Sequence, residues 1–158
     1  MLCLLFGVSG MSAQKTLSYV ALELDEASHE RVAVWAENHL PWTTDKIIAH
    51  HMTIVHHTGL RTTMDDPDVA ANDYVLAWAM AHEGETFDLM VSEVGVSDKA
   101  FALLVSDADV PSRNRMRHIT LATNPATGGK AVDSNYITQW QPLQEPMKLK
   151  GKVTFFYK

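Results

Sequence analysis

Two separate segments of the chain carry the same four-residue pattern within runs of apolar and β-branched residues. The first segment is AHHMTIVHH at 49–57, and the second is RHITLAT at 117–123. Each contains histidine, an apolar residue, threonine and a further apolar residue, in that order. Runs of this composition favour β-strands. A chain with both segments is therefore expected to build a sheet that presents two similar polar pairs.

Strand geometry fixes the direction of these side chains. Residues i and i+2 of a strand share one face, so His51 and Thr53 point the same way, as do His118 and Thr120. The intervening apolar residues pack into the layer behind. If the two strands lie near each other in one sheet, the four polar groups converge on a single cleft.

The other segments predict a mixed chain. Ala27, Arg31, Val34 and Trp35 fall at helical spacing after a first strand. Runs of strands broken by single helices are typical of the α+β class, and the similar surroundings of the two motifs suggest two related halves. The expected order is a strand at 16–25, a helix at 26–40, a strand at 45–57, a helix within 67–84, two or three strands at 86–106, a strand at 117–123, a short helix at 131–143 with Asp133 or Ser134 near its N-cap, and a closing strand at 147–158.

Composition excludes several classes of protein. With 158 residues, 46% apolar and 20% charged, the chain is typical of a soluble domain with a sizeable core. A net charge of −6 provides no basic field for a long duplex, so a nucleotide or an RNA end is the favoured partner. The single cysteine, Cys3, excludes an internal disulfide. We expect a cytoplasmic monomer that does not act at a membrane.

The first residues, MLCLLFGVSG, form an apolar run that is too short to span a membrane. The run also lacks the basic residues of a signal-peptide start. We expect residues 1–14 to be a dispensable extension, with Met11 as an alternative start, and 15–158 to be a single domain. A secretory or anchoring segment is the alternative.

Two imidazoles and two hydroxyls suit the cleavage of a phosphodiester. A neutral histidine takes a proton from the attacking oxygen, and a protonated histidine gives one to the leaving oxygen. Threonine hydroxyls donate hydrogen bonds to phosphate oxygens, where charge must be stabilised. This chemistry requires no metal and no cofactor. From the residues alone, the alternative is that two strands share the His-x-Thr pattern by chance and form no site.

Other residues are weaker candidates. His50, His51, His56 and His57 suggest zinc, but His51 and His57 lie about 20 Å apart along an extended strand, too far for one metal ion. The absence of G-x-S-x-G and of Walker A strings disfavours a serine hydrolase and ATP-driven ligation. The candidate substrate contacts are Tyr19 for base stacking, His57 at the lip of the cleft, and Arg117 and Lys130 for phosphate. The alternatives are burial in the core for Tyr19 and a solvated loop for Arg117 and Lys130.

The two tetrapeptides, HMTI at 51–54 and HITL at 118–121, resemble the paired signature of the two-histidine (2H) phosphoesterase superfamily, and are separated by 67 positions. The opening strand YVALELD also looks like the first strand of that family. The stretch HITLATNPATGGKAVDSN is similar to the cyclic-phosphodiesterase domains of tRNA ligases, as in LigT-like cyclic phosphodiesterases. The resemblance spans roughly 17–157, but 59–85 does not match the family.

This resemblance implies a bilobal α+β fold with pseudo-twofold antiparallel sheets around a central groove. It also implies metal-independent hydrolysis of 2′,3′-cyclic phosphates on RNA ends or nucleotides, with His51 and His118 as the acid–base pair and Thr53 and Thr120 as phosphate-binding residues. Which histidine is the base stays open. The alternatives are a nuclease for cyclic oligonucleotide signals or 2′–5′ linkages, and a module that binds nucleotide phosphates without turnover.

Overall fold

A computed structural model of the protein describes residues 17–56 and 74–158. The expectations for 1–14, for His57 and for the start of the middle helix lie outside these residues. The described elements follow the predicted alternation of strands and helices. They are β1 (Leu17–Leu24), α1 (Glu26–Glu37), β2 (His51–His56), α3 (Tyr74–Ala81), β3 (Thr86–Val96), β4 (Ala100–Ala108), β5 (His118–Thr123), the 3₁₀ helices η1 (Pro125–Thr127) and η2 (Ala131–Tyr136), and β6 (Trp140–Tyr157).

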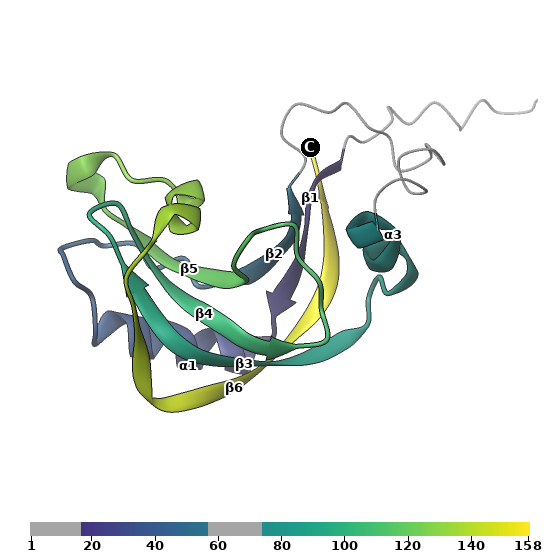
Figure 1. The fold of residues 1–158 in the computed structure, drawn as a ribbon, viewed down its shortest axis with the longest axis horizontal. Helices are drawn as coiled ribbons and strands as arrows, with labels where there is room; N and C mark the ends of the chain where they lie inside the picture. The colour runs from purple at the N-terminus through teal and green to yellow at the C-terminus, as the bar shows by residue number, and fades with distance from the viewer. Residues whose placement is uncertain (1–16, 57–73) are drawn as a thin grey trace, which may run out of the picture.

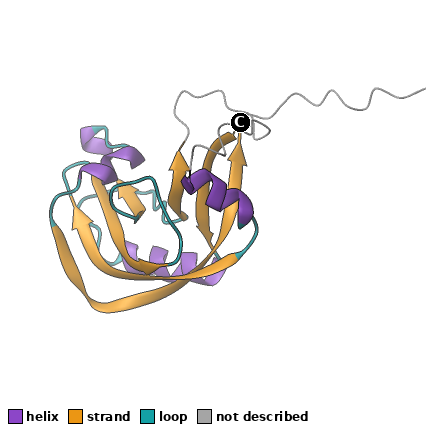
Figure 2. Ribbon diagram, turned by 45° about the vertical axis from the view of Figure 1, so that its right-hand side comes forward, coloured by secondary structure: helices purple, strands orange, loops and turns teal. Residues whose placement is uncertain are grey.

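The described strands form one closed antiparallel barrel in the order β1-β2-β5-β4-β3-β6. Strand β6 is 18 residues long and closes the ring, because it pairs with both β1 and β3. Figure 1 shows β6 running from the region of the 3₁₀ helices to the side of β1. The strands curve strongly, and the helices lie around them (Figure 2). The fold is thus a mixture of helix and strand, as the sequence predicts.

Helix α1 begins where Asp25 caps it, since the Asp25 carboxylate accepts a hydrogen bond from the Ser28 N–H at 2.8 Å. The helix packs against β1, β5 and β6. Its buried residues are Ser28, Val32 and Ala36. The helical spacing in the sequence pointed to the face that carries Ala27, Arg31, Val34 and Trp35. That face is not the buried one, since Val34 is 51% exposed. No helix of the described residues is long and apolar enough to cross a membrane.

Strand β2 is shorter than predicted because the chain kinks just before it. Ala49 is fully buried and has a φ of 51°, a left-handed conformation that costs an alanine about 1 kcal/mol. Hydrogen bonds to β5 hold the kink: the Ile48 N–H donates to the Leu121 carbonyl at 2.7 Å, and the Ala49 N–H donates to the Thr120 carbonyl at 3.0 Å. The kink fixes where His51 begins the strand.

The turn after β5 depends on two glycines. Gly128 has a φ of 67°, and a Cβ on Gly129 would lie 2.1 Å from the Lys99 carbonyl oxygen. The predicted short helix follows as η2, and Asp133 lies near its N-cap as expected. The Asp133 carboxylate accepts from the N–H of Lys130, the N-cap residue, whereas Ser134 is buried and bonds elsewhere. Strand β6 then begins at Trp140, earlier than the sequence indicates, and passes through two prolines.

Candidate functional site

The two motif strands are neighbours in the sheet. Strands β2 and β5 pair antiparallel with Met52 opposite Ile119, and both of these residues are fully buried. In an antiparallel pair, the residue after one partner lies opposite the residue before the other. His51 therefore lies across from Thr120, and Thr53 lies across from His118. The four polar side chains share one face, on the opposite side from the buried apolar pair.

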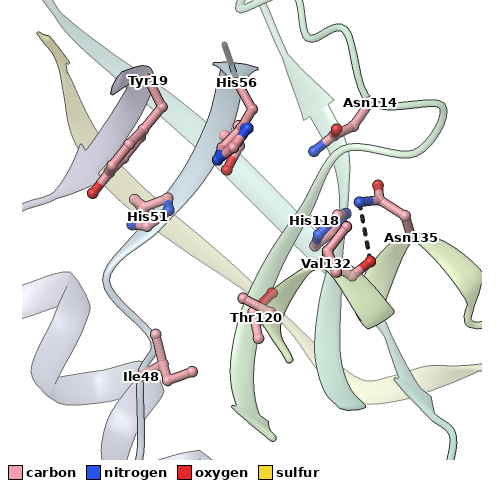
Figure 3. A pocket seen from close by; sticks show the side chains of 11 residues that line it. Tyr19, Ile48, His51, His56, Asn114, His118, Thr120, Val132 and Asn135 are labelled. Atoms are coloured by element: carbon pink, nitrogen blue, oxygen red, sulfur yellow. Dashed lines mark hydrogen bonds between the residues drawn. The ribbon is translucent and has the colours of Figure 1, made fainter. Parts of the chain in front are cut away.

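These four side chains line a single cleft of about 630 Å³. Figure 3 shows Tyr19, His51 and His56 on one side of the cleft, facing Asn114, His118 and Asn135 on the other. A volume of this size is typical of small-molecule sites. The lining residues are Tyr19, Ile48, His51, Thr53, His56, Asn114, His118, Thr120, Ala131, Val132 and Asn135.

His118 is the more tightly held of the two histidines. It is only 6% exposed, and its Nδ1 lies 2.9 Å from the Met116 carbonyl oxygen. A carbonyl only accepts, so Nδ1 carries the proton and Nε2 is free to exchange one with a ligand. Burial lowers the pKa of His118, while the bond to Met116 favours the protonated ring and opposes that shift.

His51 has a different environment. Its ring lies 5.3 Å from that of Tyr19, and among the described residues its nitrogens have no hydrogen-bond partner. Burial lowers the pKa of His51 to about 4, with further contributions from His50 and His118. The neutral ring is therefore strongly favoured in the free protein, and it offers an unoccupied acceptor nitrogen to the cleft.

The two threonines are also held differently. The Thr120 Oγ1 lies 2.8 Å from the Oγ of Ser134, a residue of η2 that is 2% exposed. Around Thr53 the contacts are to the backbone, since the Ser112 hydroxyl donates to the Thr53 carbonyl at 2.8 Å. The Arg113 N–H donates to the Ile54 carbonyl at 2.9 Å. These bonds attach the loop before β5 to β2, and they bring Asn114 to the cleft.

Sequence reasoning missed the two asparagines. Asn114 comes from the loop before β5 and Asn135 from η2, where its amide donates to the Val132 carbonyl at 3.3 Å. Both offer amide donors and acceptors beside His118 (Figure 3). Neither sits in a recognisable pattern with the histidines, because a loop brings in Asn114 and the position of η2 brings in Asn135. Only the tertiary structure reveals them.

The structure places the other predicted contacts unequally. Tyr19 lines the cleft, as expected. Arg117 does not: its guanidinium Nη1 donates to the Ala108 carbonyl at 2.6 Å and to the Val110 carbonyl at 3.3 Å, which turns it toward its own loop. Lys130 is exposed and is not among the lining residues. The predicted contacts of Arg117 and Lys130 with phosphate therefore have no support in this geometry.

The described lining of the cleft contains no lysine or arginine. An anion would therefore be held by neutral hydroxyl and amide donors and by whichever histidine is protonated. Among the described residues, no group of three or more His, Cys, Asp or Glu side chains is placed to hold a metal ion.

The sequence matches no protein-family model and no curated protein. The chemistry of this protein must therefore be inferred from the cleft itself.

Proposed function

We propose that the protein is a two-histidine phosphoesterase that hydrolyses 2′,3′-cyclic phosphates of nucleotides or RNA ends without a metal ion. The observation that carries this proposal is the crosswise pairing of the two motifs on β2 and β5 around Met52 and Ile119. It gives one small cleft two imidazoles and two hydroxyls. A bilobal fold with pseudo-twofold symmetry requires a local twofold relation between the two motifs. We include this bilobal architecture in the proposal.

The environments of the histidines support an assignment of their roles. His51, with a pKa of about 4, is neutral at any pH near 7 and can accept a proton. His118 has the carbonyl of Met116 to stabilise its protonated ring. We therefore assign His51 as the general base and His118 as the general acid. A bound phosphate anion raises the pKa of an adjacent histidine, which increases the protonated fraction of His118 in the complex.

The proposed reaction is an in-line displacement at phosphorus. His51 takes a proton from water, and the water oxygen forms a new bond to phosphorus. The bond from phosphorus to one ribose oxygen breaks, and His118 gives its Nε2 proton to that oxygen. The hydroxyls of Thr53 and Thr120 donate to the non-bridging oxygens, where negative charge must be stabilised. The product is a 2′- or 3′-phosphate monoester, and the other of these two ribose oxygens becomes a free hydroxyl.

The test is turnover of 2′,3′-cyclic nucleotides in the presence of EDTA. We expect wild-type hydrolysis, and a loss of about 10² or more in His51→Gln and in His118→Gln, the scale of acid–base groups. His39→Gln is the matched control, because His39 is exposed and follows the C-cap of α1, outside the cleft.

Two results would contradict the proposal: hydrolysis that survives both substitutions, or no hydrolysis by the wild type. Suppose instead that the protein turns over cyclic dinucleotides or 2′–5′ dinucleotides with the same dependence on His51 and His118. The two-histidine mechanism would then stand, and the assigned substrate would change. Tight nucleotide binding without any turnover would instead indicate a binding module.

A further inference from the structure

A second hollow, of about 480 Å³, adjoins the cleft and shares Tyr19 and His51 with it. We call it the side groove. A ligand with its phosphate at His51 can therefore extend into the side groove without leaving the protein surface. Its lining residues are Tyr19, Glu23, Leu24, Glu26, His29, His50, His51 and Phe156.

Flat rings make up much of the side groove. Tyr19 stacks on Phe156, with ring centroids 4.4 Å apart and planes at 11°. His29 stacks on His50, with centroids 4.5 Å apart and planes at 14°. The His29 ring is fixed further by its Nδ1, which lies 2.9 Å from the Ala49 carbonyl oxygen. Single-stranded nucleic acids are commonly recognised by bases that stack on such rings.

Two carboxylates bring negative charge to this hollow. Glu23 lies directly opposite His51 in the pairing of β1 with β2, and Glu26 follows at the start of α1. Burial raises the pKa of Tyr19 and the charge of Glu23 raises it further. The same charge opposes the lowering of the His50 pKa that burial and His29 cause. Glu23 lines the same hollow as both ring pairs.

The chemistry of the side groove differs from that of the cleft. An ionised carboxylate only accepts hydrogen bonds, and it repels phosphate. Within the described part of the chain, the Glu23 carboxylate accepts no hydrogen bond and forms no ion pair. The matching ligand is a flat, uncharged ring with N–H groups at its edge, and a nucleobase has this form.

We propose that the side groove binds the base of the nucleotide whose cyclic phosphate lies in the cleft, and that Glu23 makes it prefer guanine. This inference rests on the proposed function. Guanine presents two adjacent donors, N1–H and the N2 amino group, that match the two oxygens of one carboxylate. Uracil has a single N–H between two carbonyls, which a carboxylate repels. Adenine and cytosine place an acceptor nitrogen beside their amino group.

The first experiment compares kcat/KM for the 2′,3′-cyclic phosphates of guanosine, adenosine, cytidine and uridine. For the wild type we expect a guanosine-to-uridine ratio of about ten or more, the discrimination of one bidentate pair. In Glu23→Gln, where an amide N–H faces the guanine donors, the ratio falls close to one. The control is Glu30→Gln, the same change on an exposed residue of α1 outside both hollows, which leaves the ratio unchanged.

Equal kcat/KM values for the four nucleotides in the wild type would overturn the inference, as would a guanosine-to-uridine ratio that Glu23→Gln leaves intact. Circular dichroism shows whether Glu23→Gln is folded. If it is not, Glu23→Ala takes its place, and an unchanged ratio there again overturns the inference.

The second experiment is independent of turnover. Guanosine and uridine, which carry no phosphate, are titrated into wild type and Glu23→Gln while amide chemical shifts are followed. We expect guanosine alone to shift signals around 19–29, and only in the wild type. Guanosine binding without hydrolysis of any cyclic nucleotide supports the side groove and overturns the phosphoesterase. Hydrolysis of all four nucleotides without guanosine binding supports the phosphoesterase and overturns base binding in the side groove.

Discussion

On β5, His118 donates from Nδ1 to the Met116 carbonyl and Thr120 is bonded to Ser134. On β2, the His51 ring has no such partner among the described residues, and only the backbone of Thr53 is held, by Ser112. The two motifs are nearly the same in sequence, and they face each other across one pair of strands. The side chains of the second motif are thus held by hydrogen bonds, whereas those of the first have no hydrogen-bond partner among the described residues.

The difference has a chemical consequence. A histidine whose second nitrogen bonds to a carbonyl is stabilised in its protonated form, and it suits the role of an acid. A buried histidine without that partner stays neutral and suits the role of a base. The same tetrapeptide therefore gains opposite proton-transfer roles from the residues around it. Three predictions test whether the motifs differ in this way.

The largest expected effect is on the pH dependence of kcat/KM for a cyclic nucleotide. Activity requires neutral His51, so it rises through a pKa of about 4. It also requires protonated His118, whose pKa is lowered, so it falls before the pH reaches the ordinary 6.5. His51→Gln should lose about 10² or more in rate together with the acid limb. His118→Gln should lose a similar factor together with the alkaline limb, and interchanged limbs would reverse the assignment.

The second effect is on stability in acid. The unfolded chain protonates His51 below pH 6.5, but the folded chain does so only near pH 4, so the free energy of unfolding falls as the pH drops between these values. The expected loss is about 3 kcal/mol. Urea titrations from pH 7 to pH 4 should show a flatter dependence in His51→Gln. His118→Gln should flatten it less, because Met116 opposes the shift. Parallel curves for all three proteins would contradict this.

The smallest effect concerns Ser134, which holds only the second motif. Loss of its hydroxyl in Ser134→Ala should lower kcat/KM about fivefold, the scale of one neutral hydrogen bond. In a double-mutant cycle, Ser134→Ala should add little to Thr120→Val, since the contact is already lost. With Thr53→Val the two losses should multiply. Equal coupling to both threonines would remove the distinction between the motifs.

The sequence by itself determined the local features. The composition of 49–57 and 117–123 favours strands, and the two-residue period of a strand places His51 with Thr53, and His118 with Thr120, on one face. The alternation of strand and helix signals indicated a mixed fold, and Tyr19 was a candidate contact in the cleft, with burial in the core as the alternative. These features depend on neighbouring residues, so a single sequence contains them.

The tertiary structure alone decided the rest. The register that puts Met52 opposite Ile119 joins residues far apart in the chain, and it determines which histidine faces which threonine. Asn114 reaches the cleft from a loop and Asn135 from η2, and Arg117 is turned away because it donates to the carbonyls of Ala108 and Val110. Long-range packing also sets how deeply each imidazole is buried and what it bonds to. The pKa of a histidine follows from those surroundings, so two like motifs became unlike sites only when the chain folded.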